Sequence, residues 1–218
     1  MLSIDVGSKS GYCSAMTYLP CADGDSAGSS RFARLADIEE IRDVIFRYCR
    51  GIDRMQLDLV RACYHPDGTD NHGEFVGGVD GFVDYLADVL LLWESTSHFV
   101  GNIAIDVDAN VTGDGHANVT GDWARVETYC MAHHRRAARA DRPAVDFLAA
   151  VRYIDDFERR DGYWKIRTRV CVTDWTRTDP VPDRGWVRPD YYAQPRRDAT
   201  DPVFAPDLRG VSNRGGHE

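Results

Sequence analysis

The first half of the chain shows hydrophobic residues at three- and four-residue steps, a spacing typical of amphipathic helices. One such stripe runs over Leu35–Ile52 and a second over Val79–Trp93. Asp37 and Glu40 resemble a capping box, so we expect the first helix to begin near the start of its stripe. A short helix over Leu57–Tyr64 is expected between the two longer ones.

Downstream of these helices the hydrophobic period changes to two, which predicts strands. Before the change, His65–Gly68 reads as a turn and Thr69–Val76 as a short hairpin. Turns are predicted at Asn110–Gly115 and Asp161–Gly162, with a longer loop near Arg135–Pro143. The expected strands are His98–Val107, Ala117–His133, Val145–Phe157 and Trp164–Trp175. Helices followed by antiparallel strands indicate an α+β fold.

The two ends of the chain lack such periodicity. Residues 1–30 are rich in Gly, Ser and Asp and read as a flexible leader, while residues 31–178 form one domain. Residues 179–218 hold most of the prolines and read as an irregular extension. We expect this extension to wrap the domain or cover a neighbour through its aromatic residues, which are Trp186, Tyr191, Tyr192 and Phe204.

Composition narrows the class of protein. The chain has 218 residues, 43% of them hydrophobic, which suffices for one domain with a proper core. A formal net charge of −9 argues against a nucleic-acid surface. No apolar run approaches the ~20 residues of a membrane span and the N-terminus lacks signal-peptide features, so we expect a cytoplasmic protein. The six cysteines form no C-x-x-C pair and are expected to be buried thiols.

Three residues suggest proton-transfer chemistry without a cofactor. Tyr48 and Asp53 close the first helix, and His98 opens a strand in the run Ser97–Asn102. A carboxylate that orients an imidazole makes it a general base, and a phenol can donate to an oxyanion. Residues five apart on a helix point about 140° apart, so Tyr48 and Asp53 share a cavity only if the helix ends or distorts near Gly51. Each also has a structural interpretation, as a core or surface side chain.

Other polar and aromatic residues leave alternatives open. Asp70 and His72 share one side of a strand. Together with His65 and Asn71 they suggest a metal site, but this is the weaker interpretation because their spacing matches no ligand motif. We prefer a polar cluster at a pocket mouth that contacts a substrate hydroxyl. His133–Arg136 reads as a solvated strand end. The aromatic residues that line a cavity, or alternatively form core or subunit contacts, are Trp123, Tyr129, Phe147 and Tyr153.

The order of these elements, the run Ser97–Asn102 and the strands ending in Asp156–Ile166 resemble the SnoaL-like branch of the nuclear transport factor 2-like superfamily. The resemblance covers roughly residues 34–178. Within that branch the chain is similar to hexachlorocyclohexane dehydrochlorinases and bile acid 7α-dehydratases, and more distantly to scytalone dehydratase and ketosteroid isomerase. The resemblance implies a cone-shaped α+β barrel, with a curved and mostly antiparallel sheet wrapped around the N-terminal helices.

The resemblance also assigns roles. Asp53 matches the dyad carboxylate and His98 the catalytic histidine, while Tyr48 stands where the dehydratases have tyrosine and the dehydrochlorinase has lysine. Arg169 matches an arginine near the leaving group, although alternation also places it on a solvated face with Lys165 and Arg167. Asp70 replaces a tryptophan of the dehydrochlorinase, which disfavours a small chlorinated alkane. Expected substrate contacts are Asp70, His72, Asn102 and Trp123.

These inferences predict a cofactor-independent, metal-free lyase that removes water or formaldehyde from a hydrophobic, hydroxylated polycyclic or aromatic molecule. Steroids and lignin-derived diaryl compounds are examples. The alternatives are a polyketide cyclase or isomerase, and a non-catalytic ligand binder or dioxygenase β-subunit-like partner. One exposed sheet face predicts a homo-oligomer, a dimer or a trimer.

Overall fold

The computed structural model describes residues 25–107, 122–181, 193 and 195–208. In these ranges six strands form one sheet in the order β2-β1-β6-β5-β4-β3, in which the β1–β6 pair is parallel and the other pairs are antiparallel. The helical elements are α1 (Asp25–Asp53), α2 (Leu57–Ala62), α3 (Val79–Val89), and the 3₁₀ turns η1 (Leu90–Leu92) and η2 (Pro202–Phe204). The strands are β1 (Tyr64–Asn71), β2 (Val76–Gly78), β3 (Ser95–Val107), β4 (Trp123–Arg136), β5 (Val145–Arg160) and β6 (Tyr163–Pro180).

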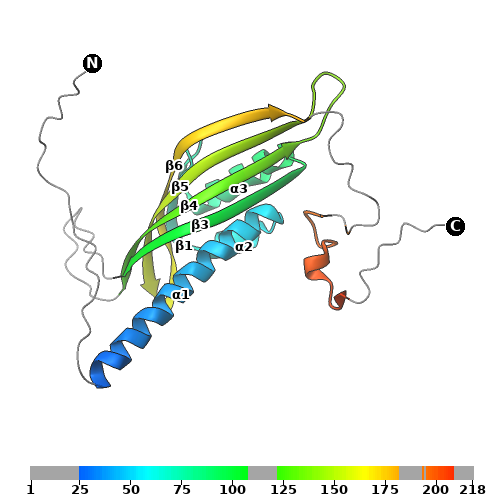
Figure 1. Cartoon of the computed structure of the whole chain (residues 1–218). Helices are drawn as coiled ribbons and strands as arrows, with labels where there is room; N and C mark the ends of the chain where they lie inside the picture. The colour runs from blue at the N-terminus through cyan, green and yellow to red at the C-terminus, as the bar shows by residue number, and fades with distance from the viewer. Residues whose placement is uncertain (1–24, 108–121, 182–192, 194, 209–218) are drawn as a thin grey trace, which may run out of the picture.

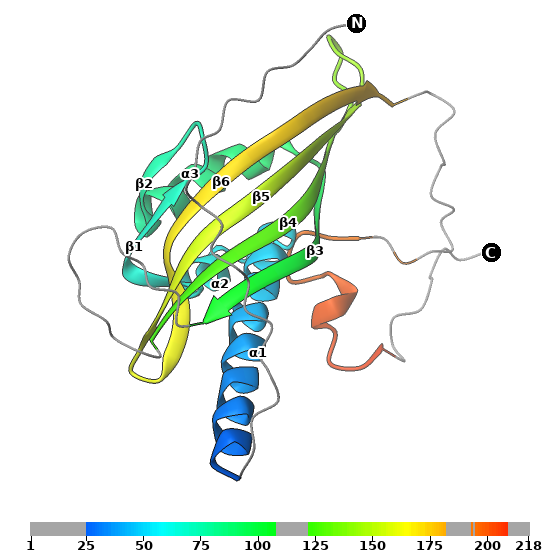
Figure 2. The ribbon, with the colours of Figure 1, turned by 60° about the vertical axis from the view of Figure 1, so that its left-hand side comes forward.

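The long strands curve strongly, and the helices lie against the concave side of the sheet (Figure 1). Turning the molecule shows α1 running along β3 at one edge, with α3 and the β1–β2 hairpin at the other (Figure 2). The core lies between them and is formed by residues such as Ile41, Phe82, Val126, Phe157 and Trp164. This architecture confirms the predicted α+β fold, with its curved and mostly antiparallel sheet around the N-terminal helices.

Helix α1 begins earlier than the sequence pattern predicts. It starts at Asp25, inside the expected leader, because an existing helix gains one hydrogen bond for each residue added. The predicted capping box is therefore wrong. Asp37 instead accepts hydrogen bonds from Trp164 Nε1 and Arg159 Nη1, and Glu40 accepts one from the Trp164 backbone N–H. These two carboxylates tie α1 to the end of the β5–β6 hairpin. Leu35, expected on the buried stripe, is 50% exposed.

The other end of α1 determines where Asp53 lies. The helix does not distort at Gly51 but continues through it to Asp53. A Cβ at Gly51 would lie 2.7 Å from Val60 Cγ2, so the glycine allows α2 to pack closely against α1. The helix ends at Asp53, and two residues later Met55, with a positive φ of 56°, turns the chain. Asp53 is thus held in the last turn of a helix that packs along β3.

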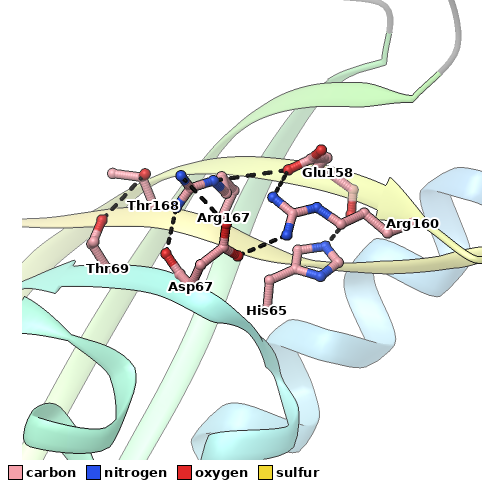
Figure 3. A network of polar contacts seen from close by, with 7 residues as sticks. All are labelled: His65, Asp67, Thr69, Glu158, Arg160, Arg167 and Thr168. Carbon is pink, nitrogen blue, oxygen red and sulfur yellow. Dashed lines mark hydrogen bonds and ion pairs between the residues drawn. The ribbon is translucent and has the colours of Figure 1, made fainter.

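The segment His65–Gly68 is part of strand β1 and not the predicted turn. Between Tyr64 and Thr69 the register with β6 shifts, and a proline is tolerated at such an irregularity. A polar network on the sheet holds this stretch (Figure 3). Asp67 accepts a hydrogen bond from Arg160 at 2.7 Å and pairs with Arg167, and the His65 ring bonds the Glu158 carbonyl.

Residue Arg167 is also the extra residue of a bulge in β6. In the β5–β6 ladder Phe157 faces Ile166 while Asp156 faces Thr168, so Arg167 has no partner on β5. An inserted residue reverses the alternation of faces along a strand. Arg169 therefore points into the core and is fully buried. The sequence-based interpretation of Arg169 on a solvated face with Lys165 and Arg167 is wrong for this reason.

The other boundaries need little correction. The Val79–Trp93 helix is confirmed as α3 with η1, and the turn at Asp161–Gly162 is confirmed by positive φ at both residues. The predicted loop near Arg135 begins later, because β4 extends to Arg136. The expected turn Asn110–Gly115 and the start of the Ala117–His133 strand lie outside the described residues, as do Cys13 and Cys21. Cys49, Cys63 and Cys130 are buried free thiols, and Cys171 is half-buried.

The described part of the C-terminal extension docks on the domain. Arg197 donates hydrogen bonds to three backbone carbonyls, those of Ile52, Leu90 and Trp93. Phe204 lies under the guanidinium of Arg50. The described part of the extension thus packs against the end of α1, which is one of the two expected arrangements. Trp186, Tyr191 and Tyr192 lie outside the described residues. None of the helices in the described ranges combines the length and apolar character that a membrane span requires.

Candidate active site

The Asp53 carboxylate and the His98 imidazole form a hydrogen-bonded pair. Asp53 Oδ1 lies 2.7 Å from His98 Nδ1, and Oδ2 accepts the His98 backbone N–H at 3.0 Å. Thr96, two residues earlier on the same strand, donates its hydroxyl to Oδ1 at 2.9 Å. Both oxygens are therefore occupied by β3, which fixes the carboxylate and the ring together. The contact joins the last turn of α1 to the start of β3.

Electrostatics keep the Asp53 carboxylate ionised. Burial alone would raise the pKa of Asp53, but the hydrogen bonds and charge from His98, with the Thr96 bond, lower it below its usual value. An ionised carboxylate at Nδ1 leaves Nε2 of a neutral ring as the free acceptor. The side chains are 8% exposed for His98 and 16% for Asp53. The pair therefore has the geometry of a general base with its orienting group.

The His98 ring packs against a second histidine that the sequence analysis did not associate with it. The rings of His98 and His134 meet edge to face with centroids 5.3 Å apart, and Trp93 and Phe147 cover the other sides of His134. Burial, followed by the proximity of His98, lowers the pKa of His134 to about 3. His134 is thus a neutral wall beside the base, and its prediction as part of a solvated strand end is wrong. Strand pairing of β3 with β4, which the sequence does not specify, creates this contact.

An open pocket of about 320 Å³ lies in front of the pair. Its volume is at the low end of small-molecule sites, which measure about 300–1,000 Å³. The last turns of α1, the start of β3 and the C-terminal segment form its wall. The lining residues are Phe46, Cys49, Arg50, Asp53, Arg54, His98, Val100 and Val203. The wall is mixed in character, with two arginines beside apolar side chains.

Tyr48 and Arg169 lie together in the core and not on the wall of this pocket. The Arg169 guanidinium carbon is 4.1 Å from the Tyr48 ring centroid and 4.3 Å from that of Tyr153, so the cation is stacked between two aromatic faces. Its Nε and Nη2 donate to both oxygens of Asp155 at 2.7 Å. Nη1 is buried without a hydrogen-bond partner in the described residues. Sequence reasoning missed Asp155, which only the β5–β6 register places opposite Arg169.

Asp70 and His72 form a second carboxylate–histidine pair. Asp70 is opposite Arg169 in the β1–β6 ladder and accepts the Tyr64 hydroxyl at 2.6 Å and His72 Nδ1 at 3.1 Å. Burial opposes charge on His72, but the hydrogen bonds of its ring to Asp70 and Cys171 raise its pKa to about 9. The His72 side chain is 26% exposed. The structure thus places the predicted polar cluster next to Arg169.

Two predicted substrate contacts are not brought to the dyad. Trp123 starts β4 and faces Glu158, whereas Ala132 is the residue of β4 opposite His98. Nine residues of strand span about 30 Å. Asn102 is exposed at a bulge of β3 that shifts the register after Val100. Tyr129, a suggested cavity residue, is 46% exposed on the outer face.

In the described ranges no three His, Cys, Asp or Glu side chains gather to hold a metal ion.

Comparisons with known proteins agree with this architecture. The family model of the SnoaL-like domain matches residues 33–170. A crystal structure of a candidate scytalone dehydratase from Novosphingobium aromaticivorans superposes with a TM-score of 0.57 at 23% identity, covering 73% of this chain and 98% of that one. A hexachlorocyclohexane dehydrochlorinase from Novosphingobium barchaimii gives 0.58 at 20% identity, covering 73% and 99%. Among curated proteins no match is found. Since the family model spans more than half of the sequence, the chain belongs to the SnoaL-like domain family.

Proposed function

We propose that the protein is a cofactor-independent lyase in which His98, oriented by Asp53, removes a proton from the substrate. The observation that carries the proposal is the contact of both Asp53 oxygens with His98, through its ring and its backbone N–H. If the Asp53–His98 pair served stability alone, its imidazole would not need to line an open pocket, as it does. The substrate is a hydrophobic, hydroxylated aromatic or polycyclic molecule. The products are an unsaturated molecule with water, an enol with formaldehyde, or an alkene with both formaldehyde and water.

The proton balance of the reaction is simple. His98 Nε2 takes a proton from carbon or from a hydroxyl, and the imidazolium that forms is stabilised by the Asp53 carboxylate. In a dehydration the same proton, or one from another donor, protonates the departing hydroxide. Loss of formaldehyde instead starts with removal of the hydroxymethyl proton, and the carbon–carbon bond to that carbon breaks. Its electron pair forms an enolate that is protonated, or it expels a neighbouring hydroxide that leaves as water. Both outcomes use one base and one donor.

The second part of the proposal assigns Tyr48 and Arg169 as donors to a developing oxyanion. Burial holds the pKa of the Tyr48 hydroxyl well above its ordinary value, so it stays protonated. Arg169 Nη1 lacks a hydrogen-bond partner in the described residues, and buried donors in native proteins are normally satisfied. A substrate oxygen would satisfy it. Since neither side chain lines the open pocket, this part is tested separately from the dyad.

A substrate screen tests the function. Hydroxysteroids, lignin-type diaryl diols and polyketide intermediates are incubated with the purified protein, and mass spectrometry detects loss of water or formaldehyde. We expect turnover that survives exhaustive chelation and needs no added nucleotide or flavin. Loss of activity on chelation, restored by zinc or iron, would contradict the cofactor-independent mechanism.

A further inference from the structure

The pocket in front of the dyad combines an apolar surface with a positive charge that has no ion-pair partner among the described residues. Phe46, Val100 and Val203 supply the apolar side, and Arg50 and Arg54 supply two cations. The chain as a whole carries a net charge of −9. A positive pocket on an acidic protein is a local exception that requires its own explanation.

The two arginines differ in what they already bind. Arg54 donates to the Asp53 carbonyl at 3.3 Å, and its Nε lies 3.7 Å from Asp201 Oδ2. Asp201 belongs to the C-terminal segment, where its oxygens accept hydrogen bonds from the backbone N–H groups of Arg196 and Val203. Arg54 therefore serves to anchor the C-terminal segment to α1.

Arg50 has no acidic partner within 4.0 Å in the described part of the chain. Its guanidinium carbon lies 5.6 Å from the Phe204 ring centroid, a contact that uses the face of the cation. Stacking through the face leaves the N–H groups at the edge of the guanidinium free to donate. The edge of Arg50 is thus available to a ligand in the pocket.

Asp53, the carboxylate among the lining residues, does not turn its oxygens toward a ligand in the pocket. Both oxygens of Asp53 accept hydrogen bonds from His98, and Oδ1 also accepts one from Thr96. Both of its oxygens are therefore turned toward β3 and already accept hydrogen bonds there. A ligand that enters the pocket therefore contacts the guanidinium of Arg50 and the apolar side chains of the wall.

We propose that this pocket selects an amphipathic organic anion, whose carboxylate pairs with Arg50 while its apolar body packs on Phe46, Val100 and Val203. The inference rests on the proposed function in taking the dyad pocket as the substrate site. It narrows the substrate class to hydroxylated aromatic or alicyclic acids. Val203, from the C-terminal segment, becomes a specificity-determining residue of the site.

Binding of two matched probes tests this without turnover. The probes are 2-naphthoate and the neutral 2-naphthalenemethanol, titrated calorimetrically into the full chain at low salt. We expect the wild type to bind the acid roughly tenfold more tightly, as one charge-assisted contact allows. Arg50→Gln should abolish this preference and Arg50→Lys should retain part of it. Salt should reduce the preference, because the pocket is open to solvent.

Two further variants control the location. Arg42→Gln removes an exposed cation of the same helix that pairs with Glu39, and it should leave both affinities unchanged. Val203→Trp fills the pocket and should weaken both probes. Equal affinities of the wild type for the two probes, an undiminished preference in Arg50→Gln, or no binding of either probe at millimolar concentration would each overturn the proposal.

The two proposals fail in different ways. If the carboxylate preference is found but the substrate screen shows no turnover, the lyase function is rejected and the anion site stands. If neutral molecules are turned over and the naphthoate preference is missing, the anion site alone is rejected.

Discussion

The guanidinium of Arg169 is stacked on the ring of Tyr48, with 4.1 Å between the guanidinium carbon and the ring centroid. This contact places Tyr48 in a buried cluster with Arg169, Asp155 and Tyr153, away from the wall of the dyad pocket. The core of the protein thus contains the buried ion pair of Arg169 with Asp155, and two aromatic rings cover the guanidinium. The dyad and this cluster can be tested by separate substitutions.

Tyr48→Phe keeps the ring that covers Arg169 and removes only the hydroxyl. That hydroxyl makes no hydrogen bond to another described residue, so the melting temperature should change little. If it donates to an oxyanion, turnover should fall by ~10²–10³-fold. Tyr64→Phe is the matched control, because it breaks a 2.6 Å bond to Asp70 and should cost about 1 kcal/mol of stability. Unchanged turnover in Tyr48→Phe would assign Tyr48 to the core alone.

Asp155→Asn should destabilise the protein strongly. The carboxylate and its partner Arg169 are both fully buried, and removal of one partner leaves an uncompensated charge that costs about 3–5 kcal/mol. Asp179→Asn, which removes an exposed pair with Arg177, should cost less than about 1 kcal/mol. Urea unfolding measures both values. Equal effects of the two variants would show that the Asp155 pair adds nothing beyond a surface contact.

The stability that His72 contributes should depend on pH in the alkaline range. Its folded pKa of about 9 lies above the unfolded value of about 6.5. The contribution is therefore fully present below about pH 6.5 and is lost as pH rises through 9. His72→Gln should be destabilised relative to the wild type at pH 6 and much less so at pH 10. Titration of the ring by NMR checks the cause, and a midpoint near or below 6.5 would refute it.

The outer face of the sheet should form a subunit contact. Phe99, Met131, Ala150 and Trp175 face one another in a row across β3, β4, β5 and β6, and Phe99 and Trp175 are 73% and 47% exposed. Such a row is a liability on a monomer. Light scattering should give a multiple of the 24.5 kDa chain mass, and Trp175→Lys should reduce it. A single 24.5 kDa species at micromolar concentrations would exclude the contact.

Periodicity predicted the helices and strands because each element buries one face. It placed Ile41, Ile45 and Tyr48 on the buried face of α1, where they lie. It failed at Asp37 and Glu40, whose partners Arg159 and Trp164 are more than a hundred residues away. Contacts between residues so far apart in the sequence have no local signal.

Among the site residues, the resemblance to the family predicted that Asp53 and His98 form a pair. It did not predict which side chains surround them. The bulge at Arg167 turns Arg169 inward, and alternation alone predicts the opposite face. His134 meets His98 only through the β3–β4 register, and Trp123 is removed from the site by that same register. A one-residue shift exchanges the faces of a whole strand, so these placements needed the structure.

The role of the Asp53–His98 pair is tested by comparing the turnover of His98→Ala, Asp53→Asn and His133→Ala on a substrate identified by the screen. His133 pairs with Asp146 at 2.9 Å on a neighbouring part of the sheet and serves as a matched histidine–aspartate control outside the pocket. We predict that His98→Ala and Asp53→Asn lose ~10²–10⁴-fold of the rate while remaining folded, because a positioned base contributes that much. His133→Ala should keep the parental rate. Near-parental turnover by folded His98→Ala would show that His98 is not the catalytic base.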